Sequence, residues 1–239
     1  MLFRSLGHYG SPSRKKDFLQ AKSDFVHEMV LWGGLDKLSA GTTVLDVGCG
    51  IGGSSRILAQ DCGFAVTGIT ISPQQVRRAQ ELTPPGVNAH FQVDDALALS
   101  FPDASFDVVW SIEVGPHIAD KAQFAKELLR VLKPGGILVI ADCNQRDDRS
   151  KPLNWWERPV MRQLLDQWSH PAFSSIEGFS EQWRRRGWSQ ARWPLLIGLR
   201  KPSPPGWILS GRALSAQADY SNLVLSGSSS PCGKCPPSC

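Results

Sequence analysis

A glycine-rich loop near residue 50 constrains the fold of this chain more than any other feature of its 239 residues. A short run of β-branched and aliphatic residues at 43–47 leads directly into the loop 48–53 (GCGIGG), and a helical pattern follows at 54–60. Glycine lets the backbone turn tightly and lets a ligand approach it closely. A strand, a glycine loop and a helix in this order are typical of nucleotide-binding α/β domains.

Strand and helix patterns alternate along the chain as far as residue 141. Strands that alternate with helices form βαβ units with right-handed crossovers, and such a sheet is mostly parallel. We therefore predict an α/β, Rossmann-like fold with strand order 3-2-1-4-5 and a ligand crevice at the carboxyl ends of the first and fourth strands. The predicted strands are 43–47, 65–69, 89–93, 106–111 and 137–141, and the predicted helices are 17–32, 54–60, 74–82 and 121–132.

Charged residues near the loop argue against a dinucleotide, although the glycine spacing at 48–53 formally matches the G-x-G-x-x-G fingerprint. Asp46 stands two residues before the first glycine, where its carboxylate can receive a cationic ligand. The second strand ends at 68–72 without the acid that holds an adenosine ribose in NAD enzymes. The pair Asp94-Asp95 ends the third strand instead and suits an adenine amino group. An NAD oxidoreductase is therefore the least favoured alternative.

The D-x-G-x-G motif at 46–50, together with Asp95-Ala96 after the third strand, resembles the class I methyltransferases that use S-adenosylmethionine (SAM). The resemblance implies that the aspartate and glycines of the loop hold the methionine end of SAM and that Asp95 contacts the adenine. It also implies that Thr70 and Gln75 take the place of the missing ribose acid. The implied cofactor-binding residues are Tyr9, Asp46, Gly48, Cys49, Gly50, Thr70, Ser72, Gln75, Asp94, Asp95, Ala96 and Ser111.

Longer segments resemble one branch of that family, the 2-methyl-6-phytyl-1,4-benzoquinol methyltransferases of tocopherol and plastoquinone synthesis. The most specific of these segments is 159–171, and the others are 7–10, 44–56, 68–75, 110–117 with Asp120-Lys121, and 144–148. The resemblance implies methyl transfer from SAM to a ring carbon of a prenylated benzoquinol. A tocopherol or sterol C-methyltransferase is the nearest alternative, and a catalytically dead SAM-binding remnant is an alternative of another class.

Two side chains after the fourth strand are candidates for the general base that would remove a phenolic proton. Glu113 and His117 stand four residues apart at the mouth of the expected crevice, and either residue could act as this base. For both, a purely structural role remains open. His8 and Tyr9, between glycines, either close over SAM or form a surface turn.

The net charge of +4 conceals two unlike parts of the chain. The residues after Glu181 hold eight Lys or Arg and one acid, so they carry +7 and leave −3 for the first 181 residues. They are dense in Pro, Ser and Gly and show no sustained period. Codons can be chosen for residues 195–205 and for three other stretches so that translation in a shifted reading frame gives amino-acid sequences that resemble the same methyltransferase branch. We predict a methyltransferase domain at 1–182 and a frame-shifted, disordered tail at 183–239, with the last strand pair of the sheet missing.

The remaining features concern partners and location. No apolar run approaches 18 residues, and the basic tail is not interpreted as a nucleic-acid site. Cys49, Cys62 and Cys143 lack metal-ligand spacing, so we expect reduced thiols, no metal and an intracellular protein, cytoplasmic or peripheral to a photosynthetic membrane. The family resemblance also implies an upstream anchoring and SAM-covering region that residues 1–5 do not supply. The apolar stripe at 155–168 lines either a prenyl pocket or plain core.

Overall fold

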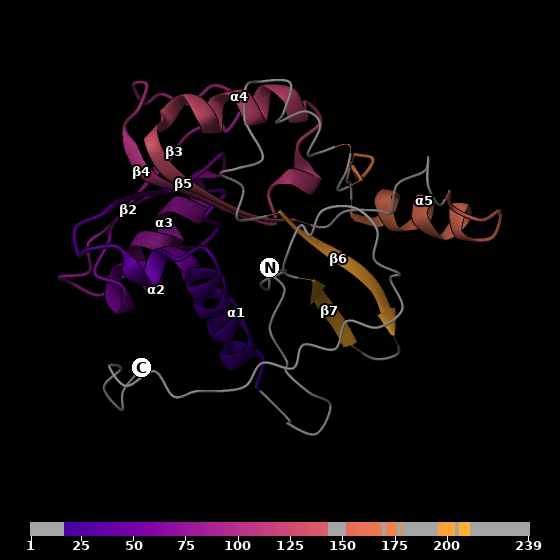
Figure 1. Ribbon diagram of the computed structural model, residues 1–239, viewed down its shortest axis with the longest axis horizontal. Helices are drawn as coiled ribbons and strands as arrows, with labels where there is room; N and C mark the ends of the chain where they lie inside the picture. Colours follow the sequence, from indigo (N-terminus) through magenta and orange to yellow (C-terminus); the bar gives the residue numbers. More distant parts are fainter. Residues whose placement is uncertain are drawn as a thin grey trace.

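The computed structural model describes residues 17–142, 152–168, 171–175, 178, 196–203 and 206–210 of the chain. Within these residues the chain forms one seven-stranded sheet with helices on both faces (Figure 1). The sheet order is β3-β2-β1-β4-β5-β6-β7, and the first five strands pair in parallel. The predicted α/β fold and the order 3-2-1-4-5 are therefore confirmed. The strands are β1 Thr43–Val47, β2 Ala65–Thr70, β3 Ala89–Val93, β4 Phe106–Ile112, β5 Leu132–Asp142, β6 Leu196–Ser203 and β7 Gly206–Ser210.

In the part of the chain that the structure describes, five α-helices accompany the sheet: α1 Phe18–Trp32, α2 Gly53–Asp61, α3 Pro73–Glu81, α4 Lys121–Val131 and α5 Glu157–Trp168. In Figure 1, α4 covers one face of the sheet, and α1, α2 and α3 cover the other. The starts of α3 and α4 follow ordinary capping rules. Ser72 precedes α3, whose first residue is a proline, and Asp120 accepts a hydrogen bond from the Gln123 amide at 2.8 Å.

The two faces of the sheet bury separate apolar clusters. β1 is buried along almost its whole length, as expected for a central strand covered on both sides. Val44 joins the cluster under α1–α3, and Leu45 joins the cluster under α4, because successive side chains point to opposite faces. Trp110 in β4 and Phe124 in α4 are each fully buried, one on each face. This packing holds the carboxyl ends of β1 to β5 along a common edge.

The predicted absence of the last strand pair is wrong. β6 pairs in parallel with the end of β5, with Ile140 opposite Leu196, and β7 pairs antiparallel with β6 (Figure 1). The physical reason lies in two short apolar runs, at 195–197 and 207–209, which are separated in the sequence by a stretch containing proline and glycine, a pattern typical of a hairpin. An open β5 edge also offers unpaired backbone groups to such a segment. The domain boundary at residue 182 stays a prediction.

Candidate active site

The predicted cofactor residues gather at the carboxyl edge of the parallel sheet. Asp46 in β1 lies opposite Gly68 of β2 and Trp110 of β4, and Thr70 at the end of β2 lies opposite Val93. Ser111 near the end of β4 lies opposite Val47. The carboxyl ends of parallel strands in an open α/β sheet are the usual place for a ligand.

Asp46 is the central charged group of this edge. Its side chain is almost fully buried, and its Oδ2 accepts a hydrogen bond of 2.5 Å from the Ser55 hydroxyl of α2. Burial raises the pKa of the Asp46 carboxyl to about 7, and the bond from Ser55 offsets only part of this shift. A carboxylate in such surroundings gains from a nearby cation more than an exposed one does, because little water screens it.

The glycine loop presses against the segment that follows β4. Gly48 has a φ of 70°, and a Cβ at this position would lie 2.3 Å from Cγ2 of Val114. Gly50 has a φ of 57° with open space where a Cβ would stand, so its need for glycine is conformational. Between them, the backbone amide of Cys49 donates to the Ile69 carbonyl at 2.9 Å. Burial raises the pKa of the Cys49 thiol, so this side chain stays protonated.

The structure brings Thr70 and Gln75 together, as the resemblance implies. The Thr70 hydroxyl donates to the side-chain Oε1 of Gln75 at 2.7 Å. The backbone amide of Gln75 donates to the Ser72 hydroxyl at 3.4 Å. Ser72 therefore has a structural role as the cap of α3. Gln75 is exposed, and Thr70 is buried beneath it.

The acid pair after β3 organises its own loop. Oδ2 of Asp94 accepts from the Ser100 amide at 3.1 Å and from the Ser100 hydroxyl at 2.9 Å. Oδ1 of Asp95 accepts from the Leu97 amide at 2.9 Å, and Ala96 between them is buried. Asp95 itself is exposed. Both acids thus hold the turn in shape, and Asp95 also faces solvent where an adenine amino group could bind.

Two exposed apolar side chains at this edge were not predicted from the sequence. Ile71 directly after β2 is 75% exposed, and Val93 at the end of β3 is 49% exposed. Large apolar side chains exposed beside a polar loop are a common sign of a binding surface. The available signal was the position of each apolar residue at the carboxyl end of a strand of the parallel sheet.

The segment after β4 carries both candidate bases. Glu113 has a φ of 59°, an uncommon value for a non-glycine residue, and its amide donates to the Ala141 carbonyl at 2.7 Å. His117 ends a short 3-10 helix, Gly115–His117, and its side chain is exposed. Ser111 is fully buried, and its hydroxyl has no hydrogen-bond partner among the described residues. Tyr9 and His8 lie outside the described residues.

Two buried charged residues beside this segment were also missed. Asp142 ends β5, and Lys121 begins α4; both have exposed fractions below one tenth. Burial raises the pKa of the Asp142 carboxyl to about 7 and lowers the pKa of the Lys121 amine. Nothing in the sequence marks either side chain as buried, because their contacts join elements far apart in the chain.

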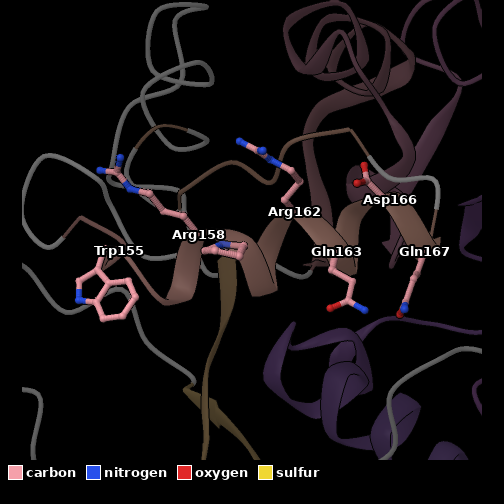
Figure 2. Close-up of a pocket in the computed structure, with 7 residues that line it drawn as sticks. Trp155, Arg158, Arg162, Gln163, Asp166 and Gln167 are labelled. Carbon is pink, nitrogen blue, oxygen red and sulfur yellow. The ribbon is translucent and has the colours of Figure 1, made fainter.

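A shallow pocket of about 380 Å³ lies along α5 and not at the sheet edge (Figure 2). Of the predicted apolar stripe at 155–168, Trp155 is 85% exposed and Val160 is 63% exposed, so these two side chains are not core. Since no residue of the pocket comes from β1 to β5, it is separate from the Asp46 edge. Its lining residues are Trp155, Arg158, Pro159, Arg162, Gln163, Asp166 and Gln167.

Among the described residues, no helix is long and apolar enough to cross a membrane. In the same part of the chain, no group of three or more His, Cys, Asp or Glu side chains is arranged to hold a metal ion.

Known proteins resemble this chain in sequence. Residues 45–140 match the family model for a methyltransferase domain. The chain is 69% identical over 208 residues to the 2-methyl-6-phytyl-1,4-hydroquinone methyltransferase of Synechocystis sp., which covers 85% of this chain and 64% of the relative. It is 44% identical over 141 residues to the chloroplastic tocopherol O-methyltransferase of Arabidopsis thaliana, which covers 57% of this chain and 40% of the relative. The chain thus spans less than two thirds of either relative.

Solved structures agree on the fold. A crystal structure of a protein proposed to be a sarcosine dimethylglycine methyltransferase, from Galdieria sulphuraria, superposes with a TM-score of 0.63 at 22% identity. The superposition covers 82% of this chain and 69% of the other. At this identity the likeness concerns the sheet and its helices alone.

Proposed function

We propose that this chain, whose residues 45–140 match the family model for a methyltransferase domain, transfers a methyl group from SAM to a ring carbon of a prenylated benzoquinol. The observation that carries the proposal is the 69% identity to the Synechocystis hydroquinone methyltransferase, which also confirms the branch that the motifs resemble. The chain spans 64% of that relative, so activity and acceptor are put forward here for testing.

The residues of the sheet edge fit SAM. SAM supplies a methyl group on a positively charged sulfur, together with an ammonium group and an adenine. Asp46 offers a buried carboxylate whose pKa is raised to about 7, and a cation nearby would favour its charged form. Asp95 and the exposed Ile71 offer an acceptor and an apolar surface for the adenine. The Thr70–Gln75 pair offers a hydroxyl and an amide for the ribose hydroxyls, the role that the family resemblance implies for it.

Catalysis by this chain rests on alignment and on proton transfer. The methyl donor is already activated, so holding the methyl group in line with the ring carbon supplies much of the rate. Removal of the phenolic proton makes the ortho carbon more nucleophilic, and Glu113 or His117 takes this proton. As the bond from the ring carbon to the methyl group forms, the methyl–sulfur bond breaks and S-adenosylhomocysteine leaves. The hydrogen on the methylated carbon is then lost as a proton, which restores the aromatic ring, and the oxygen regains a proton. Glu113 is held in a left-handed conformation, a form of strain that clusters at functional sites. His117 is exposed and carries an imidazole, the commonest general base near neutral pH.

The acceptor's prenyl tail is proposed to reach the site from a membrane surface. The named relatives come from a cyanobacterium and from chloroplasts. Trp155 and Trp156, just before α5, are both more than half exposed, and Trp155, Arg158 and Arg162 line the pocket along this helix (Figure 2). Tryptophan and arginine together suit the boundary between lipid headgroups and acyl chains.

Methyl transfer assays with labelled SAM test the proposal. The full chain is offered 2-methyl-6-phytyl-1,4-benzoquinol, γ-tocopherol and a sterol, and an Asp46→Asn variant serves as the cofactor-site control. Product from the benzoquinol alone is the expected result. Product only from γ-tocopherol would move the assignment to the second candidate, which the 44% match to the tocopherol enzyme favours. SAM binding without product from any acceptor would identify a catalytically dead remnant.

A further inference from the structure

Both backbone groups of Gly115 are held by buried charged side chains from two different elements. The Gly115 amide donates to Oδ1 of Asp142 at 3.0 Å. The Lys121 ammonium donates to the Gly115 carbonyl and to the Ile118 carbonyl. Asp142 is 5% exposed and Lys121 is 8% exposed. A single residue of the segment between β4 and α4 is therefore fixed from the end of β5 and from the first turn of α4.

The position requires glycine for a steric reason. A Cβ on Gly115 would lie 1.9 Å from Oδ2 of Asp142, well inside van der Waals contact. Any side chain here would push the carboxylate away from the Gly115 amide. Burying two charges is costly unless they are paired and hydrogen-bonded, and here each charge lowers the cost of the other.

The segment that this arrangement fixes is the one that carries the candidate bases. Glu113 lies two residues before Gly115, and His117 lies two residues after it. The Glu113 amide is bound by the carbonyl of Ala141, the neighbour of Asp142, so two successive residues of β5 hold this segment. Strained backbone persists only where the surroundings over-determine it, which fits the φ of 59° at Glu113.

We infer that Asp142 and Lys121 are positioning residues, which hold residues 113–118 through the backbone of Gly115 and so aim the general base at the acceptor. The inference rests on the proposed methyl transfer for its catalytic part. Neither side chain touches the reacting atoms in this account. Loss of either one loosens the segment and misplaces the base, and it reaches the SAM edge around Asp46 only indirectly, through the packing of Val114 against Gly48.

The test compares Asp142→Ala, Gly115→Ala and Lys121→Met with the conservative Asp142→Asn, which retains an oxygen acceptor for the Gly115 amide. Asp107→Ala is the matched control, because Asp107 also accepts from a backbone amide, that of Thr43 at 3.0 Å, and also pairs with a lysine. It lies at the opposite end of β4. Each full-length variant is assayed for kcat, for KM of both substrates, for SAM affinity by calorimetry and for amide hydrogen exchange across 113–118.

We expect Asp142→Ala, Gly115→Ala and Lys121→Met to lower kcat by about tenfold or more, because small misplacements of reacting groups are costly. SAM affinity should fall less than kcat, since the hydrogen bonds of Asp142 and Lys121 go to the backbone of 115–118 and reach the glycine loop only through Val114, and exchange across 113–118 should accelerate. Asp142→Asn should recover most of the rate. Asp107→Ala should leave both the segment's exchange and kcat unchanged.

The two levels of the inference fail separately. If the wild-type chain yields no product with any acceptor, the proposed function fails, while the exchange measurement still decides whether the two charged residues hold the segment. If the wild-type chain is active and folded Asp142→Ala exchanges and turns over like wild type, the inference alone is overturned. It is equally overturned if Asp107→Ala loosens 113–118 as much as Asp142→Ala does.

Discussion

The affinity of this chain for SAM should depend on pH through Asp46. Burial raises the pKa of its carboxyl to about 7, so near neutral pH the side chain is half protonated before a ligand binds. If a cationic ligand binds only the charged form, the apparent Kd equals the intrinsic Kd divided by the charged fraction. That fraction is about one tenth at pH 6, about one half at pH 7 and about nine tenths at pH 8. SAM should therefore bind about tenfold more weakly at pH 6 than at pH 8.

Calorimetric titration with SAM at pH 6, 7 and 8 measures this change directly. Repeating the pH 7 titration in buffers of different ionisation enthalpy should show the release of about half a proton per bound ligand. Asp46→Asn should bind weakly at every pH and lose the slope, which separates Asp46 from Asp142, whose pKa is also raised to about 7. A wild-type Kd that stays constant from pH 6 to pH 8 would refute the reasoning, and so would an unchanged slope in Asp46→Asn.

Four further outcomes follow from the site. Because folding raises the Asp46 pKa, the free energy of unfolding of the unliganded chain should fall as pH rises from about 4 to 7; Asp46→Asn should then raise the melting temperature at pH 8 but hardly at pH 4. Gly48→Ala, with its Cβ 2.3 Å from Val114, should lower stability by about 1–3 kcal/mol in denaturant titrations and weaken SAM binding. Glu113→Gly should keep or raise the melting temperature, because glycine adopts a φ of 59° without strain, yet it should reduce methyl transfer. If His117→Asn abolishes transfer and Glu113→Gly does not, His117 is the general base. Sequencing the coding DNA should reveal an insertion or deletion near codon 182, and an intact frame there would reject the frame-shift hypothesis.

The strand order could be predicted because it depends on local patterns and one rule of handedness. The alternation of strands and helices and the right-handed crossover leave few arrangements open. The first and last residues of the elements were predicted less accurately than their order. The pattern predicted a helix to residue 132 and a strand from 137, but β5 begins at Leu132, since Phe106 in β4 pairs with it across a break in the register. Pro134-Gly135-Gly136 ends the helix as expected and yet belongs to the strand.

The site was predictable only in its local part. The D-x-G-x-G motif at 46–50 has a fixed spacing that places its residues on a strand and the following turn, so the sequence located it. Asp142 and Lys121 meet only through the tertiary fold, since the two are 21 positions apart and neither has a spacing that marks a ligand. The stripe at 155–168 shows that helical periodicity identifies an apolar face but not what covers it.

Asp142 separates the part of the chain proposed to bind SAM from the elements that follow it in the sequence. Every residue proposed to hold SAM within the described part belongs to β1, β2 or β4, to the start of α3 or to the segments that directly follow β1, β2 and β3, and all of them precede Asp142. α5, the pocket along it and the β6–β7 pair all come later in the chain. In the proposed reaction, substitutions after residue 142 can therefore change which acceptor is taken while the methyl donor's site stays intact. A protein built this way can diversify its products by altering one contiguous stretch of its gene.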